Sequence, residues 1–386
     1  MMAIRLKGWS FTAAGVGISL NQTKSIPSTI QKLCILLRPI STNQTQQHSF
    51  TVSYLINSCG VSPEAALSAS KYINFETPEK PNSVLALLKA HDFSKSQISH
   101  VIGQAPQVLG SDPQRTLLPK LDFFRSVGFS EAEIAKIISA APSIFKRSLK
   151  NQLIPSYNYF KNLLGSHKNA IAAIKRFSTV LLFDLDTYVV PKIEILRQHG
   201  VPDKNIVTLL TYQPRVIMTT TDIFKDTVED VKKMGFNPLR LKFVLAIHAK
   251  RAMNLSTWER KIEVFKKWGW SEEDVLVAFG KNPWCLMASE DKIMRVMNFL
   301  VNEIGFESSS IVKRPAVFTL SLEKRIVPRC SIIQILVSRG LLKRNSGFLR
   351  MLDISEKDFL KSVTSFCKED ASKLVKMYRE KLRLVS

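Results

Sequence analysis

Residues 128–142 read GFSEAEIAKIISAAP, and this stretch contains the signals that decide the fold. A glycine opens it, a bulky apolar residue follows, and apolar residues recur six, nine and ten positions after the glycine. Spacings of three and four residues place these side chains on one face of a helix. Proline lacks a backbone donor and clashes with the preceding turn, so the helix must end before Pro142.

The same phrase returns about every 35 residues. Its opening positions are Asp92, Gly128, Gly165, Gly200, Gly235, Gly269, Gly305 and Gly340. A fixed period of this length is typical of a solenoid, because each unit must stack on its neighbours to bury its apolar face. The prolines that end the phrase are Pro106, Pro142, Pro214 and Pro283. Val180 and Ala249 stand near where two others are expected, and Pro315 comes early, ten residues after Gly305.

Each unit is expected to contain two helices. The second helix, after the glycine, has a start signal in three of the units. Ser94 with Gln97 and Ser130 with Glu133 match a capping box, and Ser271 with Asp274 comes close to one. The first helix is an amphipathic stretch before the glycine, such as Leu118–Phe124, with proline tolerated in its first turn. The glycine that ends it suits a left-handed cap residue.

The pattern therefore predicts an all-α fold, a crescent-shaped superhelical solenoid of either hand with about eight repeats. The expected divisions are an organelle transit peptide or disordered segment over 1–49, the repeat array over 50–345, and a C-terminal helical cap over 346–386. The first segment has basic, Ser-, Thr- and Gln-rich composition and no Asp or Glu, which is typical of a transit peptide. An ordinary disordered tail is the alternative.

The composition favours a polyanionic partner. The chain has 55 Lys and Arg against 32 Asp and Glu, a formal net charge of +23. Nucleic acid and an anionic membrane surface both fit such a balance. No apolar run reaches the length needed to span a bilayer. The five cysteines show no metal-ligand spacing, and neither a Walker loop nor an HExxH motif is present, so we expect no enzyme activity, cofactor or metal.

Basic residues at related repeat positions are the candidates for nucleic-acid contact. The first row lies eight residues before a repeat glycine. The second row lies three residues before a repeat glycine and consists of Arg125, Arg197, Lys232 and Lys266. Further basic groups surround or follow the helix-ending prolines. The candidate binding residues are Lys120, Arg147, Lys192, Arg215, Arg251, Lys261, Lys281, Arg314, Arg325 and Arg329. Any one of them could instead belong to an ordinary solvated helix face.

Aromatic residues follow several of the unit starts, as at Phe129 and Trp270, and are expected to be packing residues. Tyr212 and Trp284 flank prolines and could stack on unpaired bases.

The repeat phrase resembles the mTERF repeat, the unit of the mitochondrial transcription termination factors. The resemblance rests on the glycine and bulky residue, the apolar triad, the helix-ending Ala141-Pro142 or Gln213-Pro214, and the following helix in Leu118-Pro119-Lys120-Leu121 or Val190-Pro191-Lys192-Ile193. It covers about residues 50–345. It implies an organellar, plant-type member whose basic concave face lies along double-stranded DNA, most simply as a monomer in the mitochondrion and otherwise in the chloroplast.

Three functions stay open from the sequence. The first is duplex-DNA binding in transcription termination or initiation. The second is RNA binding in splicing or transcript stability. In both cases organelle transcription or splicing proteins would be further partners. The third is a helical-repeat scaffold for other proteins. The proline at the end of the second helix favours the mTERF repeat over the pentatricopeptide repeat, which has a similar period.

Overall fold

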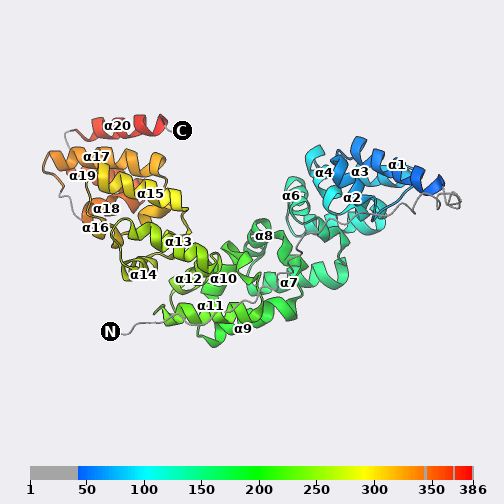
Figure 1. Cartoon of the computed structure of the whole chain (residues 1–386), viewed down its shortest axis with the longest axis horizontal. Coiled ribbons are helices and arrows are strands. Elements are labelled where there is room, and N and C mark those ends of the chain that lie inside the picture. Colours follow the sequence, from blue (N-terminus) through cyan, green and yellow to red (C-terminus); the bar gives the residue numbers. More distant parts are fainter. Residues whose placement is uncertain (1–41, 343–345, 368–369, 385–386) are drawn as a thin grey trace, which may run out of the picture.

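The computed structural model describes residues 42–342, 346–367 and 370–384, and within them every regular element is helical. The expected transit segment over 1–49 lies almost wholly outside the described residues. The helices form successive antiparallel pairs that stack into one bent arc (Figure 1). The first helices of the pairs are α1(Thr42–Asn57), α3(Glu79–Ala90), α5(Leu118–Ser126), α7(Ile154–Leu163), α9(Val190–Gln198), α11(Thr221–Lys233), α13(Leu255–Lys266), α15(Glu290–Asn298) and α17(Val327–Ser338). The all-α repeat fold expected from the sequence is confirmed.

The second helices face the inner side of the bend in the middle of the arc, where α8 and α10 lie inside α9 and α11 (Figure 1). They are α2(Pro63–Ala69), α4(Lys95–Gln104), α6(Glu131–Ala140), α8(His167–Arg176), α10(Asp203–Tyr212), α12(Leu241–Arg251), α14(Glu272–Lys281), α16(Ser308–Val312) and α18(Ser346–Asp353). The three expected capping boxes, at the starts of α4, α6 and α14, are all formed.

A left-handed residue joins the two helices of each pair. Gly128 has φ 100° and Gly200 has φ 78°, a region that suits glycine because it has no Cβ. In most pairs the next residue donates its N–H to the carbonyl five residues earlier, as Phe129 does to Phe124 at 3.1 Å. This is the hydrogen bond of a Schellman cap, and the two rings pack with centroids 5.7 Å apart. The expected packing role of the residue after the glycine is thus confirmed at Phe129.

Asp92 occupies this turn in the second pair and has φ 59°. Replacing it by glycine is expected to raise the free energy of unfolding by about 1 kcal/mol, because the left-handed region strains a residue with a Cβ. Urea denaturation of the two proteins measures the difference. Gly200→Ala is the matched opposite change and should lower the free energy of unfolding by a similar amount; equal midpoints for all three chains would contradict the expectation.

The second helix ends as the prolines predict, and a short 3₁₀ helix follows it. Ala141, which precedes Pro142, leaves the helical region, with φ −144° and ψ 69°, because steric contact with a following proline ring disfavours the α conformation. The 3₁₀ helices are η1(Pro106–Gly110), η3(Pro142–Lys146), η5(Ser178–Leu182), η7(Pro214–Ile217), η8(Pro283–Met287) and η10(Pro315–Thr319).

The three departures from the repeat have separate structural outcomes. Ser178 rather than Val180 takes the proline position, and Phe177 before it still adopts φ −155° and ψ 79°. Ala249 lies inside α12, which continues to Arg251, and the next described element is α13 rather than a 3₁₀ helix. Pro315 comes early because α16 is only five residues long.

After each 3₁₀ helix the chain enters the first helix of the next pair, and most of these first helices begin with a π-helical turn and a side-chain cap. The π-helical segments are η2(Pro113–Leu117), η4(Leu149–Leu153), η6(Leu185–Val189) and η11(Leu322–Ile326), with η9(Phe299–Glu303) at the end of α15. Ser148 and Asp184 are two of the caps, and each accepts a hydrogen bond from a backbone N–H of the first turn. Such a bond satisfies one of the donors that a helix start leaves free.

One apolar core runs from Tyr54 to Tyr378. Two further helices, α19(Glu356–Phe366) and α20(Ala371–Arg383), follow the last pair, and α20 lies against α17 at the end of the arc (Figure 1). The helix α18, which begins inside the segment expected to be a cap, takes the place of a second helix in its pair. Among the described helices, none combines the length and apolarity needed to cross a bilayer.

Candidate nucleic-acid interface

The repeat gives the array two chemically different long edges. The first, here called the glycine edge, consists of the ends of the first helices, the left-handed turns and the starts of the second helices. The second, here called the proline edge, consists of the ends of the second helices, the 3₁₀ helices and the starts of the next first helices.

Three cations on the glycine edge, Arg125, Arg197 and Lys266, are neutralised by carboxylates. Arg125, three residues before Gly128, pairs with Asp122 and, at 2.6 Å, with Glu131 in the first turn of α6. The same arrangement recurs two units and four units later. Arg197 pairs with Glu194 and Asp203, and Lys266 pairs with Glu263 and Glu272, all at 2.8–3.0 Å. These cations clamp the two helices of one pair together and carry little free charge toward a phosphate.

Four of the candidate binding residues are buried, which corrects the sequence prediction for them. Lys120 and Lys261 are 8% and 7% exposed, and Lys192 and Arg329 are fully enclosed. Their charged groups bond to backbone carbonyls in the interior, so they are not available to a polyanion on the surface.

The carbonyl partner lies at a fixed distance along the chain. Lys120 donates to the Phe145 carbonyl at the end of η3, and Lys261 donates to the Leu286 carbonyl in η8, each 25 residues further on. Arg329 reaches the Ile354 carbonyl, also 25 residues further, at 2.7 Å. Lys192 instead donates to the Tyr188 carbonyl at 2.6 Å. Lys120, Lys261 and Arg329 thus satisfy carbonyls that a helix end leaves without an intrahelical donor.

Burial lowers the pKa of Lys120, Lys192 and Lys261, because it penalises the charged ammonium form, and nearby Arg251 lowers that of Lys192 further. A local pattern could have revealed this burial from the sequence. Each of the four cations has an apolar residue three positions before it and another four positions after it, as Leu117 and Phe124 flank Lys120. At helical spacing the cation therefore lies within the apolar stripe.

Three further candidates are half-buried and hold other parts of the fold. Arg251 donates to the Met218 carbonyl just beyond η7, and burial lowers its pKa. Arg314 pairs with Asp353 at 3.5 Å. Arg325 donates to the carbonyls of residues 352–354 at the end of α18, and burial lowers its pKa as well.

The remaining candidates, Arg147, Arg215 and Lys281, are exposed on the proline edge. Among the described residues none of the three has a carboxylate partner. Exposed cations next to them on the same edge are Lys146, Lys150, Arg176 and Lys313. Sequence reasoning missed Arg176 because Ser178 replaces the proline that marks the position; Lys281 stands at the same place, two residues before Pro283.

Arginine and aromatic side chains interleave on the proline edge between α8 and α10. The Arg176 guanidinium lies 5.0 Å from the ring centroid of Tyr212, and Arg215 lies 5.5 Å from that of Phe177. Each pair joins one unit to the next and orients a guanidinium by a cation–π contact. Tyr212 is 56% exposed, so its ring is accessible from solvent.

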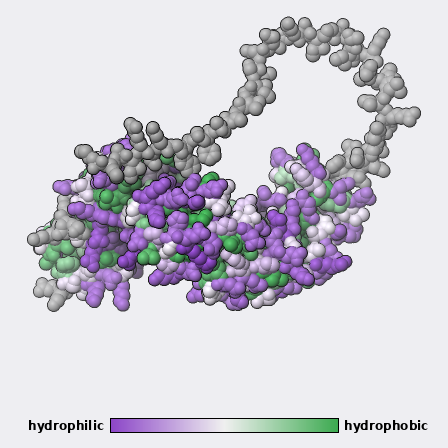
Figure 2. All heavy atoms as spheres, turned by 90° about the horizontal axis from the view of Figure 1, so that it is seen from below, coloured by the Kyte–Doolittle hydropathy of each residue, from purple (hydrophilic) through white to green (hydrophobic). Residues whose placement is uncertain are grey.

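The face of the arc seen from below in Figure 1 is largely hydrophilic, and its hydrophobic residues form separate patches (Figure 2). Stacking has therefore placed most of the apolar faces of the helix pairs in the core, as a repeat array requires. Within the described residues, His, Cys, Asp and Glu side chains do not gather in threes as a metal site would need.

Fold and edges together define an all-α helical-repeat protein with a cationic edge. The mTERF family model matches residues 85–253 and 251–360, which is more than half of the chain, and the chain belongs to the mTERF family.

Two curated relatives come from Arabidopsis thaliana. The chain is 22% identical to a protein named transcription termination factor MTERF8, chloroplastic, over 263 residues. The alignment covers 68% of this chain and 52% of the relative. Over 202 residues it is 23% identical to one named transcription termination factor MTERF15, mitochondrial, 45% of which is covered. The chain thus spans about half the length of each of these relatives.

Proposed function

We propose that this protein binds double-stranded DNA along its proline edge and regulates transcription in an organelle. The observation that carries the proposal is the separation of charge between the two edges. Arg125, Arg197 and Lys266 of the glycine edge are clamped by carboxylates, whereas Arg147, Arg215 and Lys281, at related positions of the proline edge, have no such partners. A row of unpaired cations supplies the phosphate contacts that dominate affinity for a duplex.

The organelle and the step of transcription come from the relatives. Their names place one in the chloroplast and one in the mitochondrion, and both names state transcription termination. We propose the mitochondrion for this chain, with the chloroplast as the alternative, and control of termination or initiation as its role. Binding as a monomer, alongside other transcription or splicing proteins, belongs to the same proposal.

The proposed role is binding rather than catalysis. Two carboxylates of the clusters that could act as general acids or bases are already engaged in holding helix starts. Glu133 closes the capping box of α6 and pairs with Lys175, and Asp274 closes that of α14. Both partners of Glu133, the Lys175 ammonium first and the Ser130 N–H second, lower its pKa.

RNA binding is the second candidate, and the interleaved cluster of Arg176, Tyr212, Phe177 and Arg215 favours it. Single-stranded nucleic acid binds to basic grooves in which aromatic rings stack on unpaired bases, and the accessible Tyr212 ring is of that kind. A role in intron splicing or transcript stability would follow from such binding.

A titration of the protein against matched duplex DNA, single-stranded DNA and single-stranded RNA at several salt concentrations tests the proposal. We expect preference for the duplex and a log–log salt slope of about −0.9 for each phosphate neutralised. Preference for RNA would move the function to transcript processing. Weak, salt-insensitive binding to all three would contradict both and leave the protein-interaction scaffold.

A further inference from the structure

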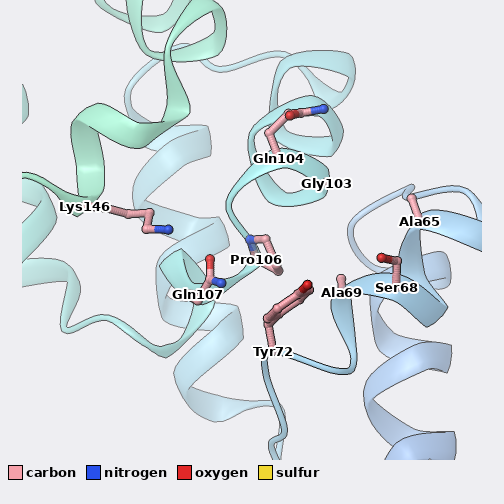
Figure 3. Close-up of a pocket in the computed structure, with 9 residues that line it drawn as sticks. All are labelled: Ala65, Ser68, Ala69, Tyr72, Gly103, Gln104, Pro106, Gln107 and Lys146. Atoms are coloured by element: carbon pink, nitrogen blue, oxygen red, sulfur yellow. The ribbon is translucent and has the colours of Figure 1, made fainter. Parts of the chain in front are cut away.

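A pocket of about 240 Å³ opens at the N-terminal end of the proline edge, where α2, α4 and η1 meet Lys146 of η3. Figure 3 shows the Gln104 amide turned away from Tyr72 and Lys146, so the polar groups around this pocket do not meet on one ligand. The inner side of the arc, by contrast, carries a regular pattern over four neighbouring units.

An apolar stripe crosses the inner side of the arc on the second helices α8, α10, α12 and α14. Its members each stand five residues after the N-cap of their helix, and they are Ile171, Val207, Leu245 and Leu276. The four helices pack against one another in this order (Figure 1), so equal positions on them form one row. The first three side chains are half-buried, and Leu276 is 45% exposed.

The stripe is widest and most exposed at α12 and α14. Leu241, one turn before Leu245, is 42% exposed, and Val277, next to Leu276, is 43% exposed. Gly280, one turn after Leu276, has no side chain, and a Cβ built there meets nothing within 4 Å, so the backbone of α14 is open to close approach. An exposed apolar surface that polar residues surround marks a site of interaction with another protein.

A row of lysines runs beside the stripe. Lys168, Lys204 and Lys242 each stand two residues after the N-cap and three residues before a member of the stripe, so each lies on the same face of its helix as that member. All three are exposed, and within the described part of the chain none of them has a carboxylate partner. Glu273 takes this position on α14, so the row ends at α12.

We propose that the inner side of the arc binds an acidic amphipathic helix of a partner protein, with its apolar face on the stripe and its carboxylates on the lysine row. Aliphatic side chains offer no hydrogen bond to a phosphate or a base edge, whereas an amphipathic helix docks by laying its apolar face on such a surface. The lysines beside the stripe complement carboxylates that flank that apolar face.

The length of the stripe also fits a helix. Axes of packed helices lie about 8–10 Å apart, so the three intervals from α8 to α14 span roughly 24–30 Å. A helix of about 16–20 residues has that length at 1.5 Å per residue. The inference goes beyond nucleic-acid binding and leaves the proline edge free for it.

The test uses a synthetic helical peptide of about 20 residues, with leucine along one face and glutamate on the other. The same peptide with lysine in place of glutamate is the charge control. Leu276→Gln combined with Val277→Gln removes the exposed end of the stripe, and glutamine is a good helix former. Leu67→Gln combined with Leu255→Gln is the matched control, because these leucines are 61% and 56% exposed but belong to α2 and α13, outside the stripe.

Fluorescence anisotropy at one salt concentration measures the binding of each peptide and of duplex DNA to the three proteins. We expect the variant of Leu276 and Val277 to bind the acidic peptide at least about 10-fold more weakly than the wild type, as loss of central apolar contacts does in protein interfaces. The variant of Leu67 and Leu255 should match the wild type. The wild type should bind the lysine peptide at least about 10-fold more weakly than the acidic one, and all three proteins should bind the duplex equally.

Equal affinities of the wild type and the variant of Leu276 and Val277 for the acidic peptide would overturn the inference. A loss of duplex affinity in that variant would assign the stripe to nucleic acid and overturn it as well. Self-association of the wild type that the variant abolishes, measured by sedimentation, would assign the stripe to a second copy of this chain instead of an acidic partner. Failure of the wild type to bind duplex DNA would overturn the proposed function alone.

Discussion

Replacing Arg329 by methionine is expected to lower the free energy of unfolding by about 3 kcal/mol. The Arg329 side chain is fully buried, and its Nη1 donates to the carbonyls of Met351, Leu352 and Ile354 at 2.7–3.2 Å. Methionine fills much of the same volume but donates nothing. The Met351 carbonyl would lose its side-chain donor, the Leu352 and Ile354 carbonyls would keep only Arg325, and Glu356 would lose its partner at 3.2 Å. Hydrogen bonds to a charged group contribute about 1.5–3 kcal/mol each.

The measurement is urea denaturation, with hydrogen exchange over residues 346–384 to locate the loss. Since each unit of a repeat array contacts only its neighbours, we expect faster exchange in α18 first. Arg339→Met is the control, because the Arg339–Asp370 pair is exposed to solvent and should contribute far less. Identical urea midpoints for Arg329→Met and wild type would show that the buried guanidinium does not stabilise α18.

Replacing Arg147, Arg215 and Lys281 together by glutamine is expected to weaken duplex binding roughly 100-fold at physiological salt. If each contacts one phosphate, the log–log salt slope becomes shallower by about 2.7, at 0.9 per contact. Extrapolated from 1 M salt, where this contribution vanishes, to about 0.15 M, that slope change corresponds to about two powers of ten. Fluorescence anisotropy across a salt series measures both quantities.

A second triple variant, with Arg125, Arg197 and Lys266 changed to glutamine, removes the same formal charge from the glycine edge. These side chains already pair with two carboxylates each, so we expect the salt slope to stay at its wild-type value. If the two triple variants lose affinity and slope equally, net charge alone governs binding and the proline edge is not the interface.

The helix boundaries were predictable because they depend on local chemistry. A proline beyond the first turn ends a helix, and a left-handed cap needs glycine or a tolerant residue such as Asp92. The capping boxes of α4, α6 and α14 likewise involve residues only three positions apart. Such signals act within one turn and can be read from the order of residues.

The fate of each cation was harder to predict, because it depends on a partner far along the chain. Lys120 lies within an apolar stripe, between Leu117 and Phe124, and its ammonium meets a carbonyl 25 residues away, whereas Lys146 is exposed. The apolar flanks of Lys120 are visible in the sequence, but its carbonyl partner is not. The same holds for Arg125, whose neutralisation requires the turn at Gly128 to bring Glu131 within reach. Repeat position therefore predicted which residues are equivalent, but it did not predict which of them face solvent.

The buried cations also bear on how the arc can deform. Lys120, Lys261 and Arg329 each tie the first helix of a pair to the end of the second helix or its 3₁₀ extension, so these bonds stay inside one unit. Links between units include half-buried ones, such as Trp270 with Ser308, as well as exposed ones, such as Arg260 with Glu290. Because the buried cations hold the geometry inside their own units, a change in the curvature of the arc has to arise from rotations between units.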